Sequence, residues 1–122
     1  MSESTPTTGK QVTERNRGLL ESLRVPASHK GDFAQLIQAS VAAVWERSGL
    51  TPAQRSLGTI AMLSALVRPD ELRNHVRMGL DNGLEADEIC ELVLQCAVYA
   101  GFPAAVQAFE VVTEVFAERG LS

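Results

Sequence analysis

Residues 51–83, TPAQRSLGTIAMLSALVRPDELRNHVRMGLDNG, contain the signals for two helices joined at a proline. Thr51 is a favourable N-cap for the first helix. Pro52 suits its first position, and Gln54 completes a capping box. From residue 57 to residue 67 nearly every side chain is apolar or small. A helix that is apolar on all sides is expected to be buried on all sides.

The second helix of this stretch is bounded by a proline and a glycine. Pro69 breaks the first helix, and the second should run from about residue 70 to residue 82. Gly83 then supplies the left-handed residue with which many helices end.

Similar signals predict three further helices. Asp32 is a plausible N-cap for a helix that runs to about Ser48 and stops at Gly49, with apolar side chains at helical spacing. The other two helices should cover residues 86–100 and 103–118, with a break at Gly101. No segment alternates with the two-residue period of a strand.

The predicted fold is therefore all-α, with five main helices in one domain. We expect residues 15–122 to form this domain and residues 1–14 to form a flexible tail. Residues 15–23 could add a short helix.

Composition excludes several classes of protein. The chain has 122 residues, a net charge of -4 and a pI of about 5.1, and it has no basic cluster, which argues against nucleic acid as a partner. No apolar run reaches the length of a membrane span. The Ser/Thr-rich start at residues 1–11 does not resemble a signal peptide, so we expect a cytoplasmic protein.

The apolar residues exceed what one small domain can bury. Three helices, at residues 52–67, 86–100 and 103–117, carry apolar side chains on more than one face. A domain of this size has a high ratio of surface to volume. We therefore expect the chain to associate with copies of itself.

Cys90 and Cys96 do not form a recognisable redox or metal motif. They are six residues apart on one predicted helix, which places them on different faces and makes a disulfide between them unfavourable. The spacing fits neither Cys-x-x-Cys nor a zinc site. We interpret both as core cysteines.

The strongest candidate for chemistry is the pair Glu71 and His75, which are four residues apart and so share a helix face. A carboxylate beside an imidazole raises the imidazole pKa and orients the ring, and such a pair can transfer a proton near neutral pH. The alternative is an exposed Glu–His pair worth a few tenths of a kcal/mol. Spacing alone favours this alternative.

Arg55 is the second candidate, because it lies in the first turn of an otherwise apolar helix. A buried arginine needs a carboxylate partner from the protein or from a substrate, whereas a surface arginine does not. Arg68 has the same two interpretations. His29 in a polar loop and Tyr99 near a helix end are weaker candidates.

Several segments together resemble the carboxymuconolactone decarboxylase family. The matching segments are Arg55-Ser56-Leu57, Ile60-Ala61-Met62-Leu63, Glu71-Leu72-Arg73-Asn74-His75-Val76-Arg77, Asn82-Gly83-Leu84, Asp87-Glu88-Ile89 and Leu94 to Ala105. The last of these contains a Gln-x-Ala-x-Tyr-x-Gly-x-Pro-Ala-like run. The resemblance extends from about Phe33 to Glu118.

The resemblance also indicates which branch of the superfamily is involved. The alkylhydroperoxidase D branch has a Cys-x-x-Cys pair followed by a histidine on the same helix. Here Arg68 and Glu71 occupy the cysteine positions, and His75 occupies the histidine position. Without the two thiols, disulfide redox chemistry is excluded. The decarboxylase branch, which is all-helical, cofactor-free and oligomeric, is therefore implied.

The chain departs from the decarboxylase pattern near the expected pocket wall. The segment before the Arg55 turn keeps only Trp45 of two tryptophans that are usual in the family, and Ser48 replaces a proline. Glu85 stands where a capping threonine is usual. These differences leave the substrate open.

The resemblance implies a reaction and roles for the three candidates. A γ-lactone that carries a carboxylate loses carbon dioxide, electrons flow into the conjugated lactone, and a proton is added at carbon. Arg55 would bind the small anionic substrate, His75 would donate the proton, and Glu71 would tune His75. No metal or cofactor is implied, and the assembly would be a homotrimer or hexamer active in the catabolism of aromatic compounds. Two alternatives remain open. One is a non-redox enzyme of the same fold that acts on another lactone or on a biosynthetic intermediate. The other is a non-catalytic oligomeric binding module.

Overall fold

The computed structural model describes residues 24–121, and these form helices joined by short turns. The helices are α2 (Ala27–Trp45), α3 (Pro52–Ala65), α4 (Pro69–Asp81), α5 (Ala86–Ala100) and α6 (Phe102–Glu118). No strand occurs among the described residues, so the all-α prediction with five main helices is confirmed. The predicted tail and the possible short helix at residues 15–23 lie outside the described residues. No helix in the described part has the length and apolar character needed to cross a membrane.

Helix α2 starts and ends earlier than predicted, and it ends at Trp45 and not near Ser48. The helix begins at Ala27, so Asp32 is not its N-cap but lies inside it. Its first turn is closed by the carbonyl of Pro26, which accepts hydrogen bonds from the N–H groups of His29 and Lys30 at 2.9 and 3.0 Å. A proline in extended conformation directly before the helix thus sets its start. His29 therefore lies in the first turn of a helix and not in a loop.

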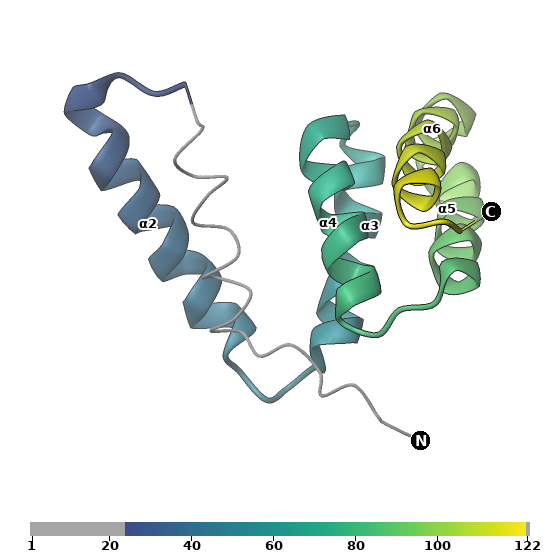
Figure 1. Ribbon diagram of the computed structural model, residues 1–122, viewed down its shortest axis with the longest axis horizontal. Coiled ribbons are helices and arrows are strands. Elements are labelled where there is room, and N and C mark those ends of the chain that lie inside the picture. The colour runs from purple at the N-terminus through teal and green to yellow at the C-terminus, as the bar shows by residue number, and fades with distance from the viewer. Residues whose placement is uncertain (1–23, 122) are drawn as a thin grey trace. The chain divides into compact units, whose positions relative to one another are not determined.

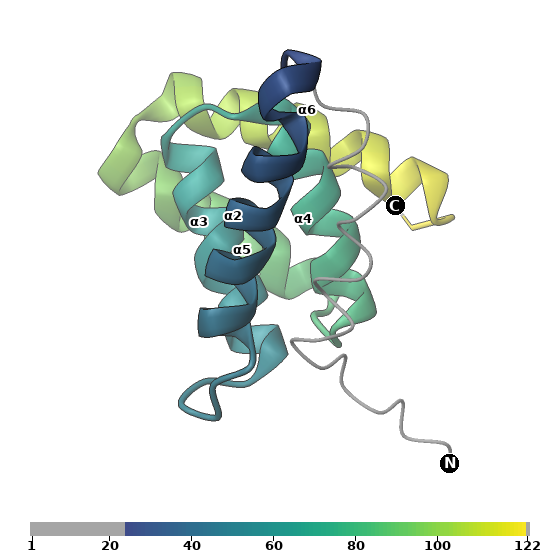
Figure 2. The ribbon, with the colours of Figure 1, turned by 90° about the vertical axis from the view of Figure 1, so that its left-hand side faces the viewer.

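The described residues divide into two compact units, residues 24–52 with α2 and residues 53–121 with the other helices. No residue of α2 is buried, and Leu36 keeps 63% of its surface exposed. The second unit contains all of the hydrophobic core, to which α3, α4, α5, α6 and the turn after α4 contribute. Figure 1 shows α3 beside α4 and α5 beside α6, and Figure 2 shows α6 running across α3 and α4. The core residues are Ile60, Leu72, Val76, Leu84, Ile89, Val93, Ala105, Ala108, Val111, Val112, Val115 and Phe116.

Glycine and capping side chains set the helix ends in this unit. Gly83 has a φ of 101° after α4, as its position in the sequence predicted. Glu85 caps α5, because it forms a capping box with Glu88, and its own N–H donates to the Glu88 carboxylate at 2.9 Å. The glutamate found where the family usually has a threonine therefore serves as the cap.

Three ion pairs join α4 and its C-terminal end to α6. Arg73 donates to Glu114 at 2.8 Å, Arg77 to Glu118 at 2.6 Å, and Arg119 to Asp81 at 2.8 Å. All are partly exposed, so each contributes modestly to stability. The α4 face that carries Arg73 and Arg77 is therefore turned toward α6.

The expectation that α3 is buried on all sides is wrong for the single chain. Only Ser56, Ile60 and Ser64 of α3 are buried, and Met62 keeps 60% of its surface exposed. The helix also ends at Ala65, two residues before the predicted end. A unit of four helices of this length has a high ratio of surface to volume, so its side chains cannot cover both faces of any one helix.

Candidate active site

Helices α3 and α4 run antiparallel and contact each other through their side chains, and the candidate residues lie on these two helices. At one end of the pair, the side-chain amide of Asn82 donates to the hydroxyl of Ser56 at 2.9 Å. Nearby, a Cβ placed on Gly79 would come within 3.0 Å of Ile60 Cδ1, so the end of the Ile60 side chain packs directly against the backbone of Gly79. The start of α3 therefore lies beside the end of α4.

His75 lies on the side of α4 that faces α3. It precedes Asn82 by seven residues, which is about two helical turns, so both side chains leave α4 in nearly the same direction. Because Asn82 contacts Ser56, His75 also points toward α3, about 10 Å closer to the other end of the helix pair. The imidazole is half-buried, and its Nδ1 atom is buried without a hydrogen-bond partner.

Burial dominates the protonation of His75. Loss of solvent lowers the imidazole pKa below its ordinary value of 6.5, and the negative charge of Glu71 only partly offsets this effect. The expectation that Glu71 would leave a raised pKa is therefore wrong in sign, although its own contribution is in the expected direction. In the free protein at neutral pH, the imidazole is mostly neutral.

Glu71 lies one turn before His75 on the same row of α4 and is exposed. The expected hydrogen bond between the two is not formed within the described chain, because Nδ1 of His75 has no partner and Glu71 makes no hydrogen bond with the ring. Their interaction in this structure is purely coulombic.

Arg55 directly precedes Ser56 and so lies at the end of the helix pair that carries Asn82. Its side chain is half-buried, and its Nε atom is withdrawn from solvent. The backbone carbonyl of Arg55 accepts a hydrogen bond from the Thr59 hydroxyl at 2.9 Å. Arg55 and Thr59 leave α3 on one flank, and the helix pair places that flank next to the row of α4 that carries His75. The structure thus brings Arg55 and the Glu71–His75 pair onto one pair of helices.

The pockets described in the unit of α3 to α6 are not shared by these candidates. The lining of these pockets, which all lie within the described residues, does not include Arg55, Glu71 or His75. One lies at the corner between α3 and α4, a second along the first turns of α5, and the third between α3 and α5. The cavity shared by Arg55 and His75, expected of a catalytic site, therefore remains a prediction about the assembled protein.

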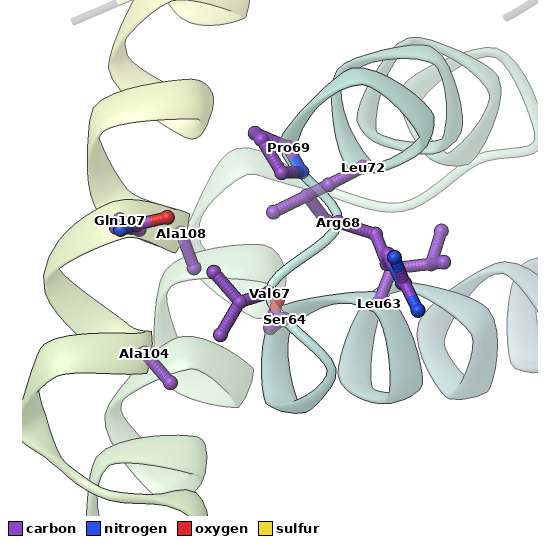
Figure 3. A pocket seen from close by; sticks show the side chains of 9 residues that line it. All are labelled: Leu63, Ser64, Val67, Arg68, Pro69, Leu72, Ala104, Gln107 and Ala108. Carbon is purple, nitrogen blue, oxygen red and sulfur yellow. The ribbon is translucent and has the colours of Figure 1, made fainter.

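The corner pocket is shown in Figure 3. Ala104, Gln107 and Ala108 of α6 line one side of it, and Ser64, Val67 and Leu72 line the other. The side chain of Arg68 extends beside Leu63 and away from Gln107. Arg68 is exposed, directly precedes α4 and lines this pocket, which Glu71 and His75 do not line.

The remaining weak candidates are at the surface. Tyr99 keeps 86% of its surface exposed and lines the pocket between α3 and α5. His29 is exposed on α2, and its Nδ1 is 2.8 Å from the hydroxyl of Ser28.

Both cysteines are free, as their spacing predicted. Burial raises the pKa of the Cys96 thiol. Burial, followed by the nearby charges of Asp87 and Glu91, raises the pKa of the Cys90 thiol. Because the thiolate is the reactive form, both residues are poor nucleophiles at neutral pH.

Sequence reasoning did not identify the Ser56–Asn82 pair as part of this region. Both side chains are buried, and 26 positions separate them, so no helical spacing connects them. The sequence feature that could have pointed to Asn82 is the Asn-Gly step at residues 82–83, because polar residues are common at the end of a helix.

A family model matches residues 31–114, and its description is the carboxymuconolactone decarboxylase family. This match covers more than half of the chain and contains Arg55, Glu71 and His75. The chain belongs to the carboxymuconolactone decarboxylase family. The resemblance seen in the sequence is confirmed, and the family's all-α, alkylhydroperoxidase D-like fold agrees with the helices described above.

Three relatives show how far this similarity extends. A 4-carboxymuconolactone decarboxylase of Acinetobacter baylyi is 49% identical over 79 residues, which is 65% of this chain and 59% of that protein. A nitrosuccinic acid decarboxylase of Metarhizium robertsii is 42% identical over 65 residues, 53% of this chain and 46% of that protein. An uncharacterised 15.0 kDa protein of Paracoccus denitrificans is 32% identical over 89 residues, 70% of this chain and 66% of that protein. The chain thus spans between about half and two thirds of the length of these relatives.

Proposed function

We propose that this chain is a cofactor-free decarboxylase that acts on a carboxylated lactone similar to γ-carboxymuconolactone. The observation that carries the proposal is the placement of a half-buried, neutral His75 and of Arg55 along one helix pair in a member of this family. Two relatives are named as decarboxylases, and both names denote carboxylic acids as substrates. A role in the cytoplasmic catabolism of aromatic compounds would follow from such a substrate.

The reaction needs an anion-binding group and a proton. The bond between the ring carbon and the carboxylate carbon breaks, and its electron pair enters the conjugated lactone. Carbon dioxide leaves, and one proton is added at carbon, so the reaction consumes a proton. Arg55 binds the anionic substrate, and its charge stabilises the lactone oxygen as that oxygen gains electron density.

The lowered pKa of His75 suits a proton donor that is charged only when substrate is bound. In the free protein, burial keeps the imidazole neutral. A substrate carboxylate that arrives near Glu71 adds a second negative charge, and both charges favour the protonated imidazole. His75 thus takes up a proton as the substrate binds and delivers it to carbon. Glu71 supports this step by charge and not by a hydrogen bond.

The decisive experiment is a decarboxylation assay with γ-carboxymuconolactone beside a panel of related acids that includes nitrosuccinic acid. We expect release of carbon dioxide from a carboxylated lactone, unchanged after treatment with a chelator. The Cys90→Ser, Cys96→Ser double variant should keep this activity, because neither thiol has a role in it. An absence of carbon dioxide release across the panel would refute the proposal and favour the non-catalytic binding module.

The second candidate function is decarboxylation of a different acid by the same site. The similarity to a nitrosuccinic acid decarboxylase and the altered segment around Trp45 and Ser48 favour it. In the same panel, turnover of an open-chain acid with no turnover of the lactone would select this candidate.

The proposal includes a homotrimer, or a hexamer built from trimers. Large apolar side chains are exposed on α3, α5 and α6, including Met62 at 60%, Val98 at 75% and Phe102 at 75%. Exposed apolar area of this kind marks a contact surface. Sedimentation at micromolar concentration should show an oligomer, and a stable, soluble monomer would contradict this part of the proposal.

A further inference from the structure

Buried polar atoms without hydrogen-bond partners concentrate along the α3–α4 contact. In the part of the chain that the structure describes, Ser64 Oγ, His75 Nδ1 and Asn82 Oδ1 are buried and make no hydrogen bond. All three belong to α3, α4 or the residue that ends α4. Such atoms are costly, so their concentration indicates a region shaped by a requirement other than stability.

One hydrogen bond in this region is fully buried. Asn82 has 3% of its surface exposed and Ser56 has 0%, and their side chains are joined at 2.9 Å. The backbone of Asn82 is itself held, because its N–H donates to the carbonyl of Met78 at 2.8 Å. Gly83 and Leu84 continue this turn with N–H groups that donate to Leu80 and Gly79 at 3.2 and 2.9 Å. The amide of Asn82 is therefore presented to α3 from a rigid helix end.

The bond fixes the two ends of the candidate site relative to each other. Arg55 is the neighbour of Ser56 in the first turn of α3, and His75 shares the α3-facing side of α4 with Asn82. A shift or rotation of α3 along α4 would move Arg55 relative to His75. The Asn82–Ser56 bond opposes both movements, and replacement of either partner strands the other as a buried polar group.

We propose that Asn82 is a positioning residue, which through Ser56 holds Arg55 in place relative to His75 and makes no contact with the substrate. The inference rests on the proposed function, because it takes Arg55 as the anion-binding group. A purely structural role for Asn82 would affect stability alone. A positioning role would also affect the affinity for the acid and the environment of the Arg55 side chain.

Ser64 offers a matched control on the same helix. It is a serine with 1% of its surface exposed, and its hydroxyl makes no hydrogen bond. The Ser56→Ala and Ser64→Ala variants therefore remove the same atom from equally buried positions, but only the first breaks the bond to Asn82. Ser56→Ala also serves if Asn82→Ala fails to fold.

The kinetic arm compares KM for the acid among these variants. We expect Asn82→Ala and Ser56→Ala each to raise KM by roughly tenfold or more, because small displacements of a binding group have large effects. The double variant should be no worse than either single one, because both remove one bond. In an Arg55→Ala background, Asn82→Ala should have no further effect on KM. Ser64→Ala should keep the KM of the unmodified chain.

The spectroscopic arm does not depend on turnover. Because Arg55 Nε is withdrawn from solvent, its proton should exchange slowly with water in a ¹⁵N NMR experiment on the full chain. Exchange should become faster in Asn82→Ala and Ser56→Ala and should stay slow in Ser64→Ala. If the unmodified chain turns over no acid, the proposed function fails while this arm still decides the positioning role. Unchanged exchange at Arg55 in both Asn82→Ala and Ser56→Ala would overturn the inference, as would a KM equal to that of Ser64→Ala in a chain that turns over the acid.

Discussion

Two of the helix pairs in the larger unit, α5–α6 and α3–α4, differ in the side chains that they bury. The contact between α5 and α6 buries Ile89, Val93 and a row of alanine and valine side chains, and no buried polar side-chain atom without a partner was found on these two helices. Helices α3 and α4 also bury apolar side chains such as Ile60 and Leu72, but they add the buried polar residues Ser56 and Ser64, and Asn82 follows α4. Helix α4 also carries the half-buried His75. The apolar pair contributes a larger share of the hydrophobic stability. The polar pair gives up part of that stability and gains titratable and hydrogen-bonding groups in a dry setting, which is where a decarboxylase needs them.

The first prediction concerns removal of the His75 imidazole from α4 of the polar pair. His75→Ala should lower turnover by roughly 10² to 10⁴, the range for a lost acid–base group. Stability should change little, because the ring makes no hydrogen bond through its buried Nδ1. The measurement is turnover at saturating acid together with a thermal melt. His29→Ala is the matched control, because His29 is exposed on α2, and it should keep full activity.

A loss of turnover in His29→Ala as large as in His75→Ala would contradict this assignment. Unchanged turnover in His75→Ala would instead support the interpretation of Glu71 and His75 as a simple helix pair.

The second prediction breaks the apolar pair. Ile89 is fully buried in the core, and Ile89→Ala should destabilise the protein by roughly 2–5 kcal/mol through lost burial and a residual cavity. Turnover per folded molecule should stay near that of the unmodified chain. Urea unfolding at one fixed protein concentration measures the first quantity, and a low-temperature assay measures the second.

Ser64→Ala sharpens the contrast between the two pairs. Its hydroxyl has no partner, so its removal should be neutral or slightly stabilising although the site is equally buried. A cost for Ser64→Ala comparable to that for Ile89→Ala would show that the two helix pairs do not differ as proposed.

The third prediction concerns the charge on the polar pair. The proposed mechanism takes the protonated imidazole as the active form, so kcat/KM should fall as the pH rises through the pKa of His75, which lies below 6.5. Glu71→Gln removes the charge that raises this pKa, so the fall should move to lower pH. The loss of turnover should be smaller than in His75→Ala. A profile that does not move, or that moves to higher pH, would exclude Glu71 as the tuning group.

The free energy of unfolding should change with pH in the opposite direction, because the contribution of His75 to it grows as the pH rises. The unfolded chain binds a proton at His75 more readily than the folded chain, because burial lowers the folded pKa below 6.5. The contribution of His75 is therefore fully present above pH 6.5 and is lost as the pH falls through the folded pKa. A rise in pH should therefore lower kcat/KM and increase stability through the same imidazole ring.

The sequence predicted the parts of this fold that depend on neighbouring residues. Pro52, Gly83 and Gly101 marked helix ends correctly, because proline and glycine restrict or free the backbone locally. The start of α2 was missed, because Pro26 acts as a cap without a side-chain hydrogen bond, a signal weaker than that of Asp32.

The chemistry was predicted less well, since it depends on contacts between helices. The spacing of Glu71 and His75 revealed that they share a face but not that His75 is half-buried, and this burial determines the sign of its pKa shift. The Ser56–Asn82 bond could not be found from spacing, because it joins residues on different helices.

The last and smallest predicted effect concerns the corner between the two helices of the polar pair. The ends of α3, α4 and α6 share one hydrogen-bond pattern, in which the left-handed residue is Val67, Gly83 and Gly120, respectively. At Val67 the φ is 56°, and its N–H donates to the carbonyl of Ser64 at 3.2 Å while the next N–H donates to Leu63 at 3.0 Å. A β-branched residue is strained in this conformation, at a cost of roughly 1–2 kcal/mol.

Val67→Gly should therefore stabilise the protein by about 0.5–1 kcal/mol, because relief of strain exceeds the greater freedom of glycine in the unfolded chain. Gly83→Ala is the reciprocal change. No atom lies within 4 Å of the added Cβ, so its cost should come from the backbone alone, at roughly 1–2 kcal/mol. Urea unfolding of both variants gives the comparison directly. The opposite outcome is that Val67→Gly destabilises the protein while Gly83→Ala behaves as expected. In that case the packing of the Val67 side chain in the pocket that contains Ser64 stabilises the turn by more than the backbone strain costs.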